Sequence, residues 1–199
     1  MHDHDRGWEE LYREQAVETM PWYYPDLDPD FKEALAELGV TSGRALDMGA
    51  GPGTQAIALA KMGFAVTATD ISATAVAKAA AKAEESGLDI DWRRDDILHT
   101  RLNETFDYIF DRGLFHVLPI DERPAYVANV YGLLSEGGYL FLKCFSDKEP
   151  AGPGPHRLSR REIDETFGSR LKIVSMADSF FPGQRRPRPR ALFVVMKRA

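Results

Sequence analysis

The sequence has little of several features that would place it in other classes of protein. Only one cysteine, Cys144, stands among 199 residues, so no disulfide can form within the chain and a disulfide scaffold is excluded. No apolar run approaches the ~18 residues of a membrane span. The acidic first residues, MHDHDRGWEE, lack the apolar core of a secretory signal. We therefore expect a soluble cytoplasmic domain with no membrane partner.

A surplus of positive charge is also missing, since the formal net charge is −6. Nucleic-acid-binding domains normally present a basic face, so we expect no nucleic-acid partner. Basic residues do gather near the C-terminus, where Arg185, Arg186, Arg188 and Arg190 are interleaved with prolines. This segment is either a solvated loop, as most charge runs are, or a local patch that attracts an anionic substrate.

What is present is an ordinary globular composition, 44% hydrophobic and 28% charged, in which short apolar runs alternate with helical patterns. The length indicates one domain, residues 1–199. The alternation predicts an α/β fold with a mostly parallel sheet and helices on both faces. We expect strands at 44–48, 64–69, 89–93, 106–111 and 139–145, and helices at 54–62, about 73–86, about 122–134 and 159–167.

The ends of these elements carry further signals. Ser72 is a suitable cap for the second helix, and the pair Gly137-Gly138 is expected to end the third. Two β-rich runs, 171–181 and 190–198, close the chain and predict an antiparallel hairpin at the edge of the sheet.

The most specific pattern is Asp47-Met48-Gly49-Ala50-Gly51-Pro52-Gly53, which lies between an expected strand and an expected helix. Glycines let the backbone turn sharply and approach a ligand, and the helix N-terminus behind them offers unpaired N–H groups. Asp70 ends the next strand, where a carboxylate can accept both hydroxyls of an adenosine ribose. The pattern therefore predicts a site for an adenosine-containing ligand.

Two ligand classes use this geometry. Dinucleotide folds favour G-x-G-x-x-G, whereas Thr54 stands where the third glycine would belong. Asp47 would repel a pyrophosphate but suits a ligand that carries an ammonium group. The residues therefore favour S-adenosylmethionine over a nicotinamide dinucleotide, and a dehydrogenase becomes the weaker hypothesis.

The segments LDMGAGPG and ATDIS resemble motif I and the following acidic residue of class I S-adenosylmethionine-dependent methyltransferases. The resemblance implies a Rossmann-like, seven-stranded sheet whose last strand is antiparallel. It also implies S-adenosyl-L-methionine as cofactor and S-adenosyl-L-homocysteine as product. The implied cofactor contacts are Trp8, Tyr12, Asp47, Gly49, Ala50, Gly51, Gly53, Asp70, Ile71, Asp96, Ile97 and Asp111.

A narrower resemblance begins at Asp111-Arg112-Gly113, which is similar to the Asp-Arg-Gly of thiopurine S-methyltransferases and of the related tellurite-resistance enzymes. The aromatic-rich segment 1–35 and the Pro/Gly-rich segment 147–158 agree with it. We interpret the first as a lid and the second as a substrate-side loop. The resemblance implies a small-molecule methyl acceptor, most simply a thiol or another soft nucleophile.

On the acceptor side, Asp111, Arg112 and His116 are the candidates for catalysis, and Trp22, Arg112 and Phe115 are those for substrate binding. Arg112 either holds an anionic or polar substrate or forms a structural salt bridge. His116 is either a general base or a packed histidine with one hydrogen bond.

Several alternatives stay open. The acceptor atom can be oxygen or nitrogen, or the chain can be a non-catalytic cofactor-binding module whose partner docks near Arg188. No metal site is expected, because His2 and His4 have no second ligand cluster. We expect a monomer or a weak homodimer.

Overall fold

The computed structural model describes residues 3–199, with side chains from residue 7 onward. The question of a metal at His2 and His4 therefore lies outside the described side chains. Seven strands form one sheet in the order β3-β2-β1-β4-β5-β7-β6. The strands are β1 (Arg44–Met48), β2 (Ala65–Asp70), β3 (Asp91–Arg94), β4 (Phe106–Arg112), β5 (Leu134–Phe145), β6 (Lys172–Phe180) and β7 (Arg190–Lys197).

Strands β1 to β5 pair in parallel, whereas β7 is antiparallel to both of its neighbours, β5 and β6. The last strand thus runs against the others, and the closing hairpin lies at the sheet edge. The predicted Rossmann-like methyltransferase topology is confirmed.

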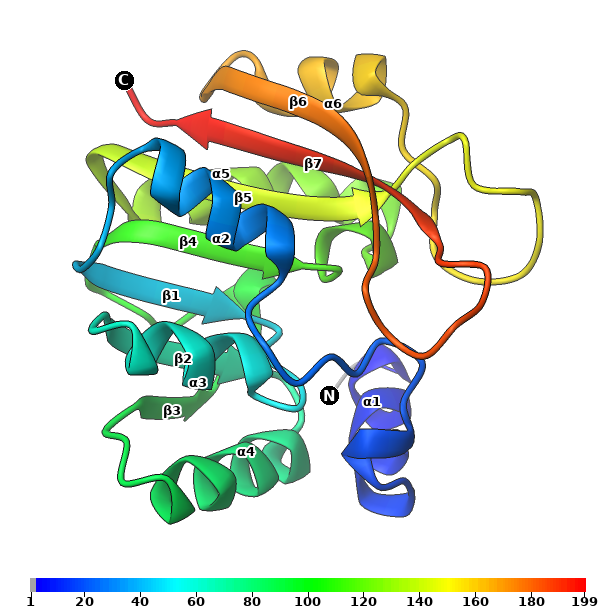
Figure 1. Cartoon of the computed structure of the whole chain (residues 1–199). Helices are drawn as coiled ribbons and strands as arrows, with labels where there is room; N and C mark the ends of the chain where they lie inside the picture. The colour runs from blue at the N-terminus through cyan, green and yellow to red at the C-terminus, as the bar shows by residue number, and fades with distance from the viewer. Residues whose placement is uncertain (1–2) are drawn as a thin grey trace.

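Helices cover both faces of the sheet (Figure 1). The helices are α1 (Asp3–Glu14), α2 (Pro29–Glu37), α3 (Thr54–Lys61), α4 (Ala73–Glu85), α5 (Arg123–Leu133) and α6 (Arg160–Phe167). Side chains alternate along the strands and so build two cores. On β5, Leu140 and Leu142 pack with α5 and α6, while Phe141 between them packs with α2 and α3.

Strand β5 is longer than expected and contains the glycine pair that should have ended the preceding helix. Helix α5 ends at Leu133, and β5 begins at the next residue. Gly137 donates its N–H to the Arg198 carbonyl, and Gly138 accepts from the Arg198 N–H. A Cβ at Gly138 would lie 2.9 Å from the Asp107 carbonyl oxygen, so the glycine permits a close approach of β4 and β5.

The segment before β1 holds an element that the sequence interpretation did not include. Helix α2 starts at Pro29, and the Asp28 side chain accepts a hydrogen bond from the Asp30 N–H. An Asp-Pro pair in these positions is a recognised start signal. Phe31 then packs against Phe110 of β4 at 5.3 Å between ring centroids.

The fold brings several distant segments to one edge of the sheet. In Figure 1 the arrowheads of β1, β4 and β5 all point to the same side of the molecule. Helix α1, the loop after β5 and the β6–β7 loop lie on that side. In open α/β sheets, ligands bind at this carboxyl edge. Within the part of the chain that is described, no helix is long and apolar enough to cross a membrane.

Candidate active site

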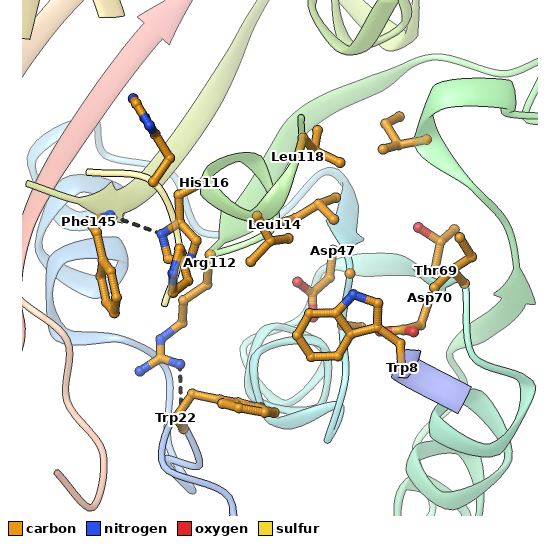
Figure 2. A pocket seen from close by; sticks show the side chains of 18 of the residues that line it. Trp8, Trp22, Asp47, Thr69, Asp70, Arg112, Leu114, His116, Leu118 and Phe145 are labelled. Carbon is orange, nitrogen blue, oxygen red and sulfur yellow. Dashed lines mark hydrogen bonds between the residues drawn. The ribbon is translucent and has the colours of Figure 1, made fainter. Parts of the chain in front are cut away.

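A cavity of about 800 Å³ lies at the carboxyl edge of the sheet. Its volume is in the range of small-molecule and cofactor sites. The N-terminal segment, the glycine loop, the turn after β4, and the loops after β5 and β6 all line it. Figure 2 shows side chains from these segments converging on one space.

The glycine loop turns as its sequence predicts. Gly49, Gly51 and Gly53 all adopt positive φ, between 49° and 73°, which other residues seldom do. Gly49 and Ala50 line the cavity, whereas Gly51 and Gly53 do not. A Cβ at Gly53 would meet Ala79 at 2.6 Å, so this glycine serves the packing of α3 against α4.

Asp70 lies beside the glycine loop and orders it. Its Oδ2 accepts from the Gly51 N–H at 2.9 Å, and its Oδ1 accepts from the Ser72 N–H at 2.9 Å. Burial raises the pKa of this carboxyl to about 6. Each oxygen keeps a further lone pair for a ligand hydroxyl, and Asp70 lines the cavity.

Asp47 is the second buried carboxyl of the cavity. Its Oδ2 accepts from the Ala56 N–H in the first turn of α3 at 3.0 Å. Burial raises its pKa to about 7. No side chain among the described residues forms an ion pair with it, so its remaining oxygen suits a cationic ligand group.

The residues expected at the adenine end also line the cavity. Asp96 begins a short 3-10 helix, η2 (Ile97–His99), and its Oδ1 accepts from the Leu98 N–H. Its Oδ2 lies 2.9 Å from Nδ1 of His99. Ile71, Asp95, Asp96 and Ile97 all face the same space, so the geometry does not choose between the two aspartates.

Three aromatic side chains of the N-terminal segment close one side of the cavity. Trp8, Tyr12 and Trp22 all line it. The Trp8 and Trp22 rings pack edge to face, with 5.9 Å between their centroids. Glu9 holds α1 in place, because it accepts from the Ser72 hydroxyl at 2.7 Å and from the Thr74 hydroxyl at 2.6 Å. These bonds lower the pKa of Glu9 to about 2.

Replacing Glu9 by glutamine should loosen the docking of α1. We expect the affinity for an adenosine-containing ligand to fall by about 1 kcal/mol, roughly fivefold, because two charge-assisted hydrogen bonds are weakened at a partly exposed site. In the wild type this stabilisation is present above pH 4.5 and is lost as the pH falls toward 2. Hydrogen exchange of residues 3–14 and calorimetric titration measure both effects. The matched variant Glu10→Gln should change neither, and equal exchange in the two variants would contradict the anchoring role.

Two predicted site residues serve the fold instead. The carboxylate of Asp111 is fully buried, accepts from the Leu114 N–H at 2.8 Å and the Tyr126 hydroxyl at 2.6 Å, and does not line the cavity. Phe115 is also fully buried, with its ring 5.0 Å from both Tyr126 and Phe167. Both side chains point into the core under the turn after β4, so this arrangement gives no support to the expected catalytic and cofactor contact of Asp111 or to the expected substrate contact of Phe115.

Arg112 lines the cavity, but each of its three side-chain nitrogens already donates a hydrogen bond within the protein. Nε donates to Asp28 Oδ2 at 2.8 Å, Nη1 to the Trp22 carbonyl at 3.0 Å and Nη2 to the Pro182 carbonyl at 2.6 Å. The bond to Trp22 is drawn in Figure 2. Of the two interpretations of Arg112, the structural salt bridge describes this geometry, and the guanidinium ties residues of three segments together.

The sequence interpretation missed the buried acid at the centre of this network. Asp28 also pairs with Lys143, whose Nζ lies 2.6 Å from Asp28 Oδ1 and 2.7 Å from Asp30 Oδ2. Both Asp28 and Lys143 are essentially without solvent exposure. The signal was a lone charge in the apolar strand YLFLKCF, which requires a buried partner.

His116 faces the cavity with its ring orientation fixed. Nδ1 accepts from the Phe145 N–H at 2.9 Å, as Figure 2 shows. Burial and the nearby charge of Arg123 lower the pKa of the ring to about 3. The neutral ring therefore carries its proton on Nε2, and neither nitrogen is placed to take a proton from a substrate.

Comparison with known proteins agrees with this geometry. Residues 45–138 match the family model described as a methyltransferase domain. Thiocyanate methyltransferase 1 of Arabidopsis thaliana is 29% identical over 167 residues, which cover 81% of this chain and 70% of that protein. The 2-heptyl-1-hydroxyquinolin-4(1H)-one methyltransferase of Mycobacteroides abscessus is 31% identical over 166 residues, 79% of this chain and 72% of that protein.

The fold is shared with solved structures. One comes from work on the conversion of a disulfide bond into a thioacetal group during echinomycin biosynthesis. It superposes with a TM-score of 0.84 at 26% identity over 98% of this chain and 92% of that one. Motif, topology and relatives together show that this chain belongs to the methyltransferases, as a class I enzyme that uses S-adenosylmethionine.

Proposed function

We propose that this methyltransferase transfers the methyl group to sulfur, or to a similarly soft nucleophile, of a small molecule. The observation that carries the proposal is the fixed neutral ring of His116, since the histidine that sequence offered as a base presents a donor instead. A thiolate is accessible near neutral pH without a base, whereas an alcohol or amine needs more help. The thiocyanate methyltransferase of Arabidopsis is named for a sulfur anion, which supports the same chemistry here.

The glycine loop and the carboxylates at the ends of β1, β2 and β3 supply the cofactor site in this proposal. Asp47 holds the ammonium of the methionine end, Asp70 accepts from the ribose hydroxyls, and Asp96 or Asp95 meets the adenine amino group. When bound, S-adenosylmethionine supplies a methyl group on an electrophilic sulfonium. Trp8 and Tyr12 exclude water from one side, and an electron-rich ring face suits a sulfonium cation.

The remaining walls then serve the acceptor. Residues 1–35 act as an aromatic lid, and residues 147–158 act as a substrate-side loop, whose Gly154, Pro155 and His156 face the cavity. In-line displacement requires the acceptor, the methyl carbon and the leaving sulfur to be aligned, so positioning is the main contribution of these walls. In this assignment Trp22 also touches the acceptor.

An oxygen acceptor is the second candidate. The relative from Mycobacteroides abscessus is named for a hydroxyquinolone substrate, so related chains of similar length accept a different chemical class. Methyl transfer from labelled S-adenosylmethionine to a panel of acceptors separates the two. The panel contains thiophenol, a thiopurine, selenite, tellurite, a phenol and an amine. Turnover of only the phenol or the amine would overturn the sulfur proposal.

Asp70→Asn tests the cofactor assignment. We expect the affinity for S-adenosylhomocysteine to fall by about 2 kcal/mol, roughly 30-fold, because charge-assisted hydrogen bonds to the ribose are lost. Calorimetric titration measures the change, and Asp89→Asn, an exposed substitution of the same kind, is the control. An unchanged dissociation constant in a folded Asp70→Asn protein would contradict the proposed contact between Asp70 and the ribose.

A further inference from the structure

A buried guanidinium in the wall of the cavity has unused hydrogen-bond donors, although it lies over the Phe115 ring at 5.1 Å from the ring centroid. Arg123 is the first residue of α5, only 5% exposed, and it lines the cavity. Its Nε and Nη2 have no hydrogen-bond partner among the described residues. Buried polar groups are almost always hydrogen-bonded, so two buried guanidinium nitrogens without an acceptor point to a ligand that supplies one.

The nearby carboxylate does not fill this role, because its oxygens are engaged elsewhere. Glu162 Oε1 lies 2.9 Å from Nε2 of His156, and Oε2 accepts from the Ser159 N–H and hydroxyl at 2.8 Å each. The Nε–Nη2 edge of Arg123 is the side of a guanidinium that binds planar anions through two parallel hydrogen bonds. Both atoms are shielded from solvent, so neighbouring side chains must shift when an anion reaches them.

The second observation is the free donor of His116. Its Nδ1 is held by Phe145, and its Nε2 has no hydrogen-bond partner in the part of the chain that is described. A Cβ at Gly113, which adopts a φ of 96°, would lie only 3.4 Å from this Nε2. Glycine at this position therefore leaves the donor edge of the ring open, and both residues line the cavity.

We propose that Arg123 and His116 form an anion-binding subsite at the acceptor end of the cavity, so that the acceptor enters as an anion. Nε2–H of His116 donates to the anion, and Arg123 supplies the positive charge that Arg112, with all three nitrogens bonded, does not. This inference rests on the proposed sulfur acceptor and deepens it. It assigns recognition of the acceptor's charge to two residues outside the cofactor loop.

The chemistry predicts how the subsite acts. The anionic sulfur forms the new bond to the methyl carbon, the bond from that carbon to the sulfonium breaks, and its electron pair stays on the departing thioether sulfur. An anion and a cation become two neutral products, and no proton needs to leave. Since charge disappears in the transition state, donors to the anion stabilise the bound acceptor more than the transition state, so they lower KM and do not raise kcat.

Thiocyanate and thiourea form the test pair, because both offer a sulfur nucleophile but only the first is charged. In Arg123→Gln and in His116→Asn we expect the KM for thiocyanate to rise ~10- to 100-fold, as for loss of a charge-assisted hydrogen bond. The kcat for either acceptor and the KM for thiourea should each change less than about threefold. The amide of His116→Asn retains an oxygen for the Phe145 N–H, and Arg123→Lys, which keeps the charge, should recover part of the loss. Arg170→Gln is the control, because Arg170 lines a neighbouring recess and lies over the Tyr131 ring but does not line this cavity.

Calorimetric titration of thiocyanate into the complex with S-adenosylhomocysteine measures the subsite without turnover. Weaker binding in both variants, with an unchanged affinity for S-adenosylhomocysteine, is the expected result. If these effects hold but no sulfur acceptor is methylated, the subsite stands and the proposed acceptor is wrong. If sulfur acceptors are methylated but both variants change thiocyanate and thiourea equally, or if the wild type binds no thiocyanate, the subsite is wrong.

Discussion

Replacing Asp28 by alanine is expected to lower the free energy of unfolding by about 3–5 kcal/mol, the typical cost of leaving buried charge unpaired. The Asp28 carboxylate is fully buried between two cations, with Oδ2 2.8 Å from Arg112 Nε and Oδ1 2.6 Å from Lys143 Nζ. Lys143 is 1% exposed and keeps only Asp30 as an acidic partner after the substitution. Urea denaturation, with the midpoint and the slope reported separately, measures the loss.

The same substitution should open the site. Asp28 starts α2 through its side chain, and its N–H donates to Gln55 Oε1 at 2.7 Å. Because Arg112 also holds the Trp22 carbonyl, loss of its acidic partner frees the segment that carries Trp22 into the cavity wall. We therefore expect faster hydrogen exchange in residues 20–30 at denaturant concentrations where the sheet is still folded.

Two control variants separate the network from a general effect of removing charge. Asp178→Ala breaks exposed ion pairs with Lys148 and Arg160, and such pairs contribute little to stability. The double variant Asp28→Asn/Lys143→Met removes one of the stranded charges and should recover part of the loss. A loss in Asp28→Ala no larger than in Asp178→Ala would contradict the central role of Asp28.

Local sequence patterns were sufficient for most of the fold. The apolar runs, the Ser72 cap and the glycine loop are features of adjacent residues, and each appears in the structure near its expected bounds. The early start of β5 is different, because Gly137 and Gly138 pair with Arg198 at the end of the chain. Such pairing is set by tertiary contact, which overrides the turn preference of two glycines.

The candidate site also has one part that local sequence predicts and one part that it does not. Asp47, Asp70 and Asp96 lie within or directly after strand ends, so motif spacing alone brings them to one cavity. The acceptor side depends on contacts between distant segments. Arg112 finds Asp28 from 84 positions away, and His116 is fixed by a backbone N–H of β5. The residues next to Arg112 and His116 in the sequence do not indicate either contact.

The affinity for S-adenosylhomocysteine is expected to rise as the pH increases from 5.5 to about 7 and then to level off. Burial raises the pKa of Asp47 to about 7, so at lower pH the unliganded protein carries a proton on this carboxyl. In the proposed complex the carboxylate faces an ammonium group, and the proton must leave when the ligand binds. Linkage then gives a slope of up to about one decade in the association constant per pH unit below the pKa.

The stability of the unliganded protein should respond with the opposite sign. A carboxyl whose pKa is raised in the folded state binds its proton more tightly than in the unfolded chain. For Asp47 the folded state is therefore progressively disfavoured as the pH rises from about 4 to about 7. A cation at this position offsets the penalty, so the increase in melting temperature caused by S-adenosylhomocysteine should be larger at pH 8 than at pH 6.

Asp47→Asn identifies the titrating group. Asparagine keeps an oxygen for the Ala56 N–H but never ionises, so the variant should bind S-adenosylhomocysteine with the same affinity at pH 6 and at pH 8. At pH 8 we expect it to bind about 2–3 kcal/mol more weakly than the wild type, roughly 30- to 150-fold, as for loss of a hydrogen-bonded charge partner. Calorimetric titration from pH 5.5 to 8.0 measures both. If the affinity of Asp47→Asn still depends on pH, the titrating group is Asp70, whose pKa is raised to about 6. That result would contradict the proposed contact between Asp47 and the ammonium group.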